Sequence, residues 1–158
     1  MRVLDQTDRL IRRLRPAVLD DLGLVEAVRT TGENSLVDSG ISFHFEVHEG
    51  EETRLSRDLE VAVYRVFQEA MTNVLRHANA KSVRVELDIG LDLLRASVED
   101  DGSGMSFSSN EHATDRPRWG LVGMRERIFQ LNGSINFGPS DSGGVRIEFE
   151  VPLRPKEP

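Results

Sequence analysis

Residues 98–104 of this chain read Val-Glu-Asp-Asp-Gly-Ser-Gly, and the interpretation of the fold begins from this stretch. Apolar side chains alternate along the residues that lead into it, at Leu94, Ala96 and Val98. This period of two is typical of a strand with one buried face, and it places Asp100 on that same face. Two glycines follow, so the backbone can turn sharply and approach a ligand. The stretch is equally consistent with a pocket for a polar ligand and with an Asx turn that closes the strand.

The composition indicates a soluble globular domain and excludes several kinds of site. The chain has 158 residues, of which 38% are hydrophobic and 30% charged, enough for one domain with a core. Its net charge of −7 argues against a nucleic-acid partner. Cysteine is absent, which excludes disulfides, thiolate nucleophiles and cysteine-bound metals. Because no apolar run approaches the ~18 residues of a membrane span, we expect a cytoplasmic location, with any membrane attachment supplied by parts outside this chain.

Four further stretches alternate apolar and polar residues and predict strands at about residues 41–47, 83–89, 135–137 and 145–151. Each strand has one apolar face, so helices must cover a single face of the sheet. The sequence therefore predicts an α+β fold, a two-layer α/β sandwich of about five mostly antiparallel strands and three helices. His44 and His48 share the polar face of the first strand, but they are ~13 Å apart along it, too far for one metal ion.

The longest predicted helix covers about residues 57–79, with Ser56 as its N-cap. One arc of it is apolar, and beside that arc the positions i, i+4, i+7 and i+8 carry four polar residues: Glu69, Asn73, Arg76 and His77. These side chains form either a solvated face or a functional one. Asparagine is a poor residue for a helix interior, which favours a polar task for Asn73.

A polar stretch without periodicity, residues 105–119, follows the opening motif and indicates a lid or binding loop. After it, residues 120–124 read Gly-Leu-Val-Gly-Met and begin another helix. The unpaired N–H groups and positive dipole at that terminus suit an anion. The alternative is a loop-to-helix junction that needs small residues for packing.

The ends of the chain differ from its middle. Residues 1–15 carry five arginines and a helical apolar stripe that ends before Pro16, and they are either the tail of a longer helix or a terminal helix folded back. We divide the chain into residues 1–16, a connecting helix at 17–40, the main domain at 41–153 and a tail at 154–158.

Three separated pieces together resemble the GHKL (Bergerat-fold) ATPases, which include gyrase, the heat-shock chaperone, MutL and the histidine kinases. Residues 68–78, Gln-Glu-Ala-Met-Thr-Asn-Val-Leu-Arg-His-Ala, resemble their N box. Residues 100–104, Asp-Asp-Gly-Ser-Gly, resemble the first glycine box, and residues 120–127 resemble the second. The resemblance covers about residues 41–153 and implies the Bergerat fold, with ATP and Mg²⁺ as ligands.

Finer detail resembles the sensor histidine kinases of the NarX- and DesK-like subfamily, which serve response regulators of the NarL type. The N box with Arg76 and His77 and the second glycine box both match that subfamily. Residues 14–24 also resemble the join between its second dimerisation helix and the catalytic domain, which implies that residues 1–16 are the remnant of that helix. The partners implied are the kinase's own dimerisation domain, in a homodimer, and a NarL-type regulator. By itself the chain is expected to be monomeric.

The resemblance also implies roles for residues at the base end of a nucleotide site. Asp100 would accept a hydrogen bond from the adenine amino group. Gly102 and Gly104 would let the backbone approach the base and sugar. Many relatives have a Gly-Thr pair at the start of the last strand, whereas this chain has Gly144 and Val145, so the hydroxyl is replaced by an apolar side chain.

At the phosphate end, the resemblance implies that Asn73 helps to hold Mg²⁺ and that Glu69 activates the attacking group or orients water on the metal. Arg76 would contact phosphates, with His77 nearby. Residues 105–119 would form the ATP lid. The phosphates would lie against the second glycine box, formed by Gly120, Leu121, Val122, Gly123 and Met124.

None of the four histidines, His44, His48, His77 and His112, lies in a phosphoacceptor motif. We therefore expect the acceptor histidine to lie upstream, so that this chain binds ATP without phosphorylating itself. The implied function is the catalytic domain of a histidine kinase. The alternatives are an ATP-driven clamp module of the gyrase or MutL type, an anti-sigma serine kinase, and a degenerate nucleotide-binding regulator.

Overall fold

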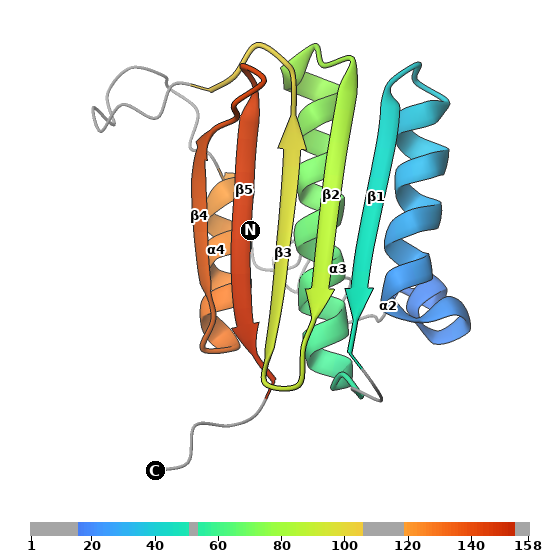
Figure 1. The fold of residues 1–158 in the computed structure, drawn as a ribbon, viewed down its shortest axis with the longest axis vertical. Helices are drawn as coiled ribbons and strands as arrows, with labels where there is room; N and C mark the ends of the chain where they lie inside the picture. Colours follow the sequence, from blue (N-terminus) through green and yellow to red (C-terminus); the bar gives the residue numbers. More distant parts are fainter. Residues whose placement is uncertain (1–15, 51–53, 106–118, 154–158) are drawn as a thin grey trace, which may run out of the picture.

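The computed structural model describes residues 16–50, 54–105 and 119–153, and its elements form two layers (Figure 1). One layer is a five-stranded sheet, and the other consists of helices that lie behind the sheet in this view. The strands are β1 (Ser42–Glu49), β2 (Ser82–Ile89), β3 (Leu93–Asp100), β4 (Ser134–Pro139) and β5 (Val145–Pro152). The helices are α2 (Ala17–Gly32), α3 (Arg57–Asn73) and α4 (Trp119–Gln130), with π-helical turns η1 (Glu33–Val37) after α2 and η2 (Val74–Ala78) after α3.

The strand order is β1-β2-β3-β5-β4, and only the pair of β1 and β2 is parallel among the four described pairings. The predicted mostly antiparallel, two-layer α+β fold is therefore confirmed. The central strand β3 pairs with β2 and with β5, and Glu99 lies opposite Arg146. This register places the end of β3 next to the start of β5, at one end of the strands. Residues 100–104 therefore lie beside the β4–β5 turn.

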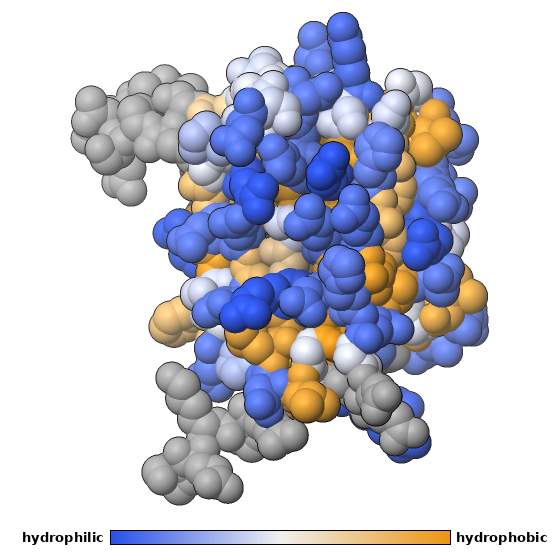
Figure 2. Space-filling view, in the orientation of Figure 1, coloured by the Kyte–Doolittle hydropathy of each residue, from blue (hydrophilic) through white to orange (hydrophobic). Residues whose placement is uncertain are grey.

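The alternating strand residues divide as the period of two predicts. The apolar set faces the helices, and Val83, Val85 and Leu94 are fully buried, whereas Phe43 and Phe45 of the edge strand β1 are half-buried. The rings of Phe67 on α3 and Phe149 on β5 meet edge to face, with their centroids 5.8 Å apart. On the opposite face of the sheet hydrophilic side chains predominate, as Figure 2 shows. Burial of apolar surface between the layers is thus the main stabilising contribution to this fold.

Helix α3 runs through the centre of the helical layer. The Ser56 hydroxyl caps it by accepting a hydrogen bond from the Leu59 amide at 3.3 Å. Its apolar arc is buried against the sheet, and Val63, Phe67 and Met71 are among its most deeply buried residues. The single helix predicted over residues 57–79 is corrected in its last part, because the chain widens into the π-helical turn η2.

Helix α2 belongs to the same core as the rest of the helical layer. Gly23 adopts φ +73°, which kinks the helix and lets Leu19 and Leu24 both be buried on either side of the kink. The Thr31 hydroxyl lies 2.8 Å from the Tyr64 hydroxyl of α3 and links the two helices. Within the helix predicted at residues 17–40, α2 ends at Gly32 and η1 at Val37, and both contribute residues to the core.

Helix α4 covers the sheet under β4 and β5 through Met124 and Ile128, both fully buried. After this helix Asn132 takes the left-handed conformation, with φ +57°. The Gly133 amide then donates back to the Ile128 carbonyl at 3.0 Å. No helix within the described ranges has the length and apolar character that crossing a membrane requires. The predicted segments at residues 1–15 and 154–158, and all but the ends of 105–119, lie outside the described residues.

Candidate functional site

Asp100 is the buried acid at the end of β3, with 6% of its surface exposed. The Gly102 amide donates to its Oδ1 at 2.8 Å, and the Val145 amide also hydrogen-bonds to the carboxylate. Burial raises the pKa of Asp100, and these two amides act in the opposite direction. No salt bridge to Asp100 occurs within residues 16–50, 54–105 and 119–153. A carboxylate held in this way is an acceptor for a neutral donor such as an amino group.

Glycines surround this carboxylate because no side chain fits. A Cβ at Gly144 would collide with the carbonyl and the Oδ1 of Asp100, and one at Gly102 would collide with the Ala78 carbonyl. Gly104 has φ +74°, which favours glycine, and a Cβ there would lie 2.9 Å from the Gly143 carbonyl. The loop after β3, the turn before β5 and the end of η2 therefore meet around Asp100.

The end of η2 is joined to the loop after β3 by the backbone. The Ser103 amide donates to the Ala78 carbonyl at 2.7 Å. Beside it, Asp101 Oδ1 accepts from the amides of Lys81 and Ser82 at 2.7 and 2.9 Å, which lower the pKa of this carboxyl. Asp101 thus fastens the end of β3 to the start of β2, whereas Asp100 remains turned into the glycine-lined corner.

A second contact joins helices α3 and α4. A Cβ at Gly120, in the first turn of α4, would collide with the Glu69 carboxylate of α3. Glu69 and Asn73 are half-buried and lie one helical turn apart, so the amide of Asn73 is on the same side of α3 as the acid that contacts the start of α4. Two of the three predicted motifs therefore meet at this contact, and the N box also meets the first glycine box at Ala78.

The other predicted residues occupy different environments. Arg76 and His77 lie on η2 and are exposed. In the second glycine box Leu121 and Gly123 are half-buried and Val122 is 47% exposed. Met124 is fully buried, so its side chain belongs to the core. Val145 is half-buried, and its amide contacts Asp100.

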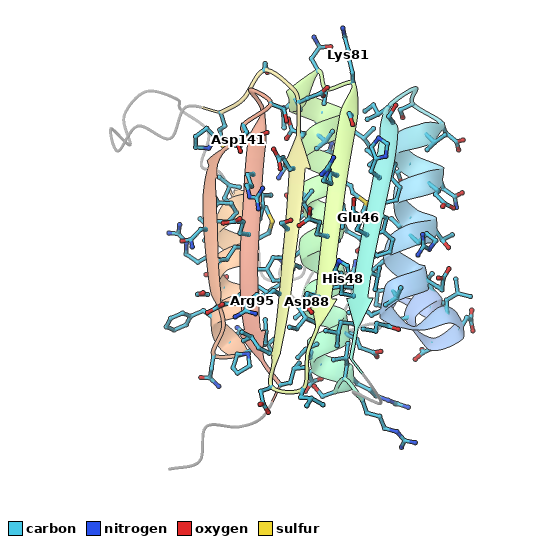
Figure 3. All side chains as sticks on the ribbon, viewed as in Figure 1. Glu46, His48, Lys81, Asp88, Arg95 and Asp141 are labelled. Carbon is cyan, nitrogen blue, oxygen red and sulfur yellow. The ribbon has the colours of Figure 1, made fainter. Side chains whose placement is uncertain are left out.

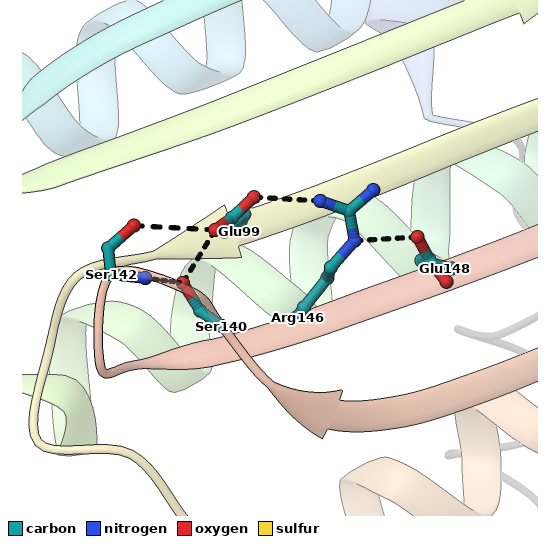
Figure 4. A network of polar contacts seen from close by, with 5 residues as sticks. All are labelled: Glu99, Ser140, Ser142, Arg146 and Glu148. Carbon is teal, nitrogen blue, oxygen red and sulfur yellow. Dashed lines mark hydrogen bonds and ion pairs between the residues drawn. The ribbon is translucent and has the colours of Figure 1, made fainter.

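A polar network that sequence reasoning missed joins β3, β5 and the turn between β4 and β5 on the open face (Figure 4). Glu99 is its centre and contacts Ser140, Ser142 and Arg146. The alternation of the strand signals that Glu99 points away from the core, but a surface acid carries no mark of its partners. Only the pairing of β3 with β5 places Arg146 opposite it.

The open face also holds a groove of about 530 Å³ that includes none of the predicted site residues. Figure 3 shows His48, Asp88 and Arg95 on this face, where the strand register aligns them. Several of its charges are paired with each other, as in Arg95 with Glu150 and Arg146 with Glu148. Its residues offer neither a glycine cradle nor an enclosed acceptor, so we place the candidate site at Asp100.

The corner at Asp100 fits a purine base with an amino group, since it offers a buried acceptor beside backbone that no Cβ obstructs. Glu69 and Asn73 supply oxygen donors, which suit a hard cation. Among the described residues no group of three or more His, Asp or Glu side chains forms a complete metal site.

Fold and site together define a two-layer α/β domain with a buried acceptor in a glycine-lined corner. The family described as histidine kinase-, DNA gyrase B- and HSP90-like ATPases matches residues 58–155. The chain belongs to this family, and the predicted GHKL resemblance is confirmed. The description of the family as ATPases also supports the prediction that the ligand is ATP.

The most similar relatives include named sensor kinases. The chain is 37% identical over 153 residues to the signal transduction histidine-protein kinase/phosphatase UhpB of Salmonella typhimurium. The matched region covers 96% of this chain and 29% of UhpB. It is 33% identical over 152 residues to the oxygen sensor histidine kinase NreB of Staphylococcus carnosus. Here the matched region covers 96% of this chain and 43% of NreB. These relatives agree with the predicted subfamily, and the chain spans less than half of their length.

Solved structures show the same fold. The catalytic domain of the histidine kinase ThkA, in a nucleotide-free form, superposes with a TM-score of 0.66 at 21% identity, covering 84% of this chain and 93% of that domain. The Acinetobacter baumannii histidine kinase AdeS gives a TM-score of 0.63 at 14% identity, covering 96% of this chain and 82% of AdeS. At these identities the likeness establishes the architecture alone.

Proposed function

We propose that this chain is the catalytic, ATP-binding domain of a two-component sensor histidine kinase of the NarX- and DesK-like subfamily. It transfers the γ-phosphoryl group of ATP to a histidine on a dimerisation domain outside this chain, for relay to a NarL-type response regulator in the cytoplasm. The observation that carries the proposal is the buried Asp100 carboxylate in its glycine cradle. The names of UhpB and NreB support the reaction type.

At the base end, the Asp100 carboxylate accepts the hydrogen bond of the adenine amino group. Burial raises the pKa of Asp100, and the Gly102 and Val145 amides favour its charged form. Gly104 and Gly144 leave room for the backbone to follow the ligand, and Val145 packs against the base where many relatives have threonine. The pocket therefore selects adenine by one buried polar contact, and loss of such a contact is costly because it leaves a desolvated group unpaired.

At the phosphate end, the half-buried Asn73 amide helps to hold Mg²⁺, which neutralises charge on the phosphate oxygens when it is bound. The nitrogen of the acceptor imidazole bonds to the γ-phosphorus, and the bond from that phosphorus to the β–γ bridging oxygen breaks, leaving ADP. Glu69 accepts the proton that the imidazole loses in this step. The exposed Arg76 and His77 face the phosphates, and the start of α4 offers its N–H groups. Catalysis is then mainly positioning and charge neutralisation.

Titration calorimetry with an ATP analogue tests the binding part of this proposal. We expect Mg²⁺-dependent binding that is lost in Asn73→Ala and strongly weakened in Asp100→Asn. Asn136→Ala, on the open face of β4, is the matched control and should bind normally. An unaltered chain without affinity for ATP or its analogues would contradict the proposed site.

The kinase part is tested with a dimerisation-domain fragment of the parent protein and ATP labelled on the γ-phosphate. Label should appear on the fragment's histidine, and none on this chain alone. Hydrolysis of ATP without labelling of that histidine would favour a clamp-type ATPase instead. Binding without either reaction would favour a non-catalytic regulator.

A further inference from the structure

We propose that Glu99 is a positioning residue for the base end of the pocket, acting through the turn at residues 140–144 from the opposite face of the sheet. The proposal rests on the proposed function, because the pocket that it serves is the adenine corner at Asp100. Glu99 and Asp100 are neighbours on β3, so their side chains point to opposite faces. Each contacts the segment that joins β4 to β5.

From the open face, Glu99 holds both arms of this turn (Figure 4). Its Oε1 accepts from the Ser140 hydroxyl at 2.6 Å and from the Ser142 hydroxyl at 3.3 Å. Its Oε2 accepts from Arg146 Nη1 at 3.0 Å, just after the turn on β5. These hydrogen bonds lower the pKa of Glu99, so the carboxylate is charged at neutral pH. The short distance to Ser140 is typical of a charge-assisted hydrogen bond.

Within the turn, the buried Ser140 passes this restraint to the glycines. Its hydroxyl accepts from the Ser142 amide at 3.0 Å, and its carbonyl accepts from the Gly143 amide at 3.0 Å. Its own amide donates to the Gly144 carbonyl at 3.0 Å. Ser140 is 7% exposed, so a break in this set would leave polar groups buried without partners.

From the helix face, the same glycines form the wall of the adenine corner. Gly144 lies against the Asp100 carboxylate, and the next amide, that of Val145, hydrogen-bonds to it. Gly143 faces Gly104 of the first glycine box. The turn at residues 140–144 contains two consecutive glycines, which are conformationally permissive, so its position depends on restraints from outside the turn. Glu99 supplies that restraint, and we infer that it holds the Val145 amide in register with Asp100.

The test compares three variants by nucleotide selectivity and by amide hydrogen exchange. Glu99→Ala removes all three contacts, and Glu99→Gln keeps an acceptor for Ser140 but loses the ion pair with Arg146. Glu150→Gln is the matched control, an acid on the same face whose pair with Arg95 lies away from the turn. Kd is measured for ATP and for GTP, which share the triphosphate and differ in the base.

We expect Glu99→Ala to lower the selectivity for ATP over GTP about tenfold, with Glu99→Gln in between and Glu150→Gln unchanged. In the same series, exchange of the Val145 amide should accelerate at least tenfold in Glu99→Ala, while amides in the middle of β3 keep their protection. Unchanged selectivity and unchanged Val145 exchange in Glu99→Ala would overturn the proposal. A parallel loss of affinity for both nucleotides together with general loss of protection would also overturn it, since it indicates a merely structural role.

The exchange measurement needs no nucleotide and therefore separates the two proposals. Failure of the unaltered chain to bind ATP would contradict the proposed function alone. The Val145 amide would still report whether Glu99 positions the turn.

Discussion

At the scale of single residues, Asp100 combines two opposing effects. Burial of its side chain raises its pKa, which disfavours the charged form, whereas the Gly102 and Val145 amides favour it. The nearby carboxylates Glu99 and Asp101 add to the first effect. The charged form of Asp100 is therefore unfavourable for stability in the free protein, and a ligand donor would relieve that cost. Such a conflict between stability and binding is common at functional sites.

Replacement of Asp100 by asparagine should separate its effect on stability from its effect on binding. Asp100→Asn removes a carboxyl group whose charged form burial disfavours and keeps an oxygen acceptor for the Gly102 amide, so we expect Tm to rise by a few degrees. ATP affinity should fall about 10- to 100-fold, because a hydrogen bond to a charged group contributes about 1.5–3 kcal/mol. Thermal unfolding and calorimetry measure the two effects. A lower Tm with unchanged ATP affinity would show that Asp100 is only a structural cap.

Gly144 and Gly138 offer a matched pair of glycine substitutions. A Cβ at Gly144 would collide with backbone and side-chain oxygens of Asp100, whereas one at Gly138 would meet nothing within 4 Å. We expect Gly144→Ala to lower the free energy of unfolding by about 1–3 kcal/mol, as overpacking does. Gly138→Ala should stay within about 0.5 kcal/mol of the unaltered chain. Urea denaturation measures both, and equal effects would contradict the packing described for Gly144.

At the scale of elements, the helical layer brings the motifs together. Helix α3 carries Glu69 and Asn73 and ends in the π-helical turn η2, whose last carbonyl receives the Ser103 amide. Helix α4 begins against Glu69. A π-helical turn is less favourable than a regular one and persists where tertiary contacts hold it, often at functional sites. The wider turn is held here between the helix core and the loop after β3.

The contact between α3 and α4 can be altered with little effect on folding. The atom that a Cβ at Gly120 would meet is the carboxylate end of the flexible Glu69 side chain, which can move away. We therefore expect Gly120→Ala to change stability by less than about 1 kcal/mol. It should lower phosphotransfer more than tenfold, because the displaced Glu69 no longer faces the reacting group. Gly138→Ala, where a Cβ would meet nothing within 4 Å, is the control. Equal phosphotransfer by the two variants would contradict a role for this contact.

At the scale of the whole molecule, the sheet has one buried and one open face. The buried face supplies the core, and the open face carries charges paired across strands, including Arg146 with Glu99 and with Glu148. Three carboxyl groups lie next to one another at the end of the central strand β3: Glu99, Asp100 and Asp101. Their titration makes the stability of the molecule depend on pH. Their pKa shifts differ in sign.

The stability of the molecule should fall in acid. The pKa values of Glu99 and Asp101 are lowered in the folded state from ordinary values of 4.5 and 3.8. Their stabilising contributions are therefore present above those values and are lost as the pH falls through the lowered folded pKa. Asp100, whose pKa is raised, acts in the opposite sense, because protonation relieves its burial. Urea unfolding at a series of pH values should show a weaker acid loss in Glu99→Gln. A variant profile parallel to that of the unaltered chain would contradict the ionised state of Glu99.

Much of this protein follows from its sequence because short-range patterns determine it. Periods of two and of 3.6 residues indicate the strands, the helices and the buried position of Asp100, and the fold class follows from the single apolar face of each strand. The motifs at residues 68–78, 100–104 and 120–127 are local as well, and they suffice to identify the family. These features depend only on which residues are neighbours along the chain.

The tertiary structure decided what depends on contacts between distant segments. The parallel pairing of β1 with β2, the π-helical turn at Val74–Ala78 and the left-handed Asn132 follow from packing that no local pattern specifies. The collision of a Cβ at Gly144 with Asp100, and the hold of Glu99 on the turn of Ser140, arise because β5 pairs with β3 across more than forty residues of chain. A surface glutamate looks the same in any sequence, and its role here depends on the strand placed beside it.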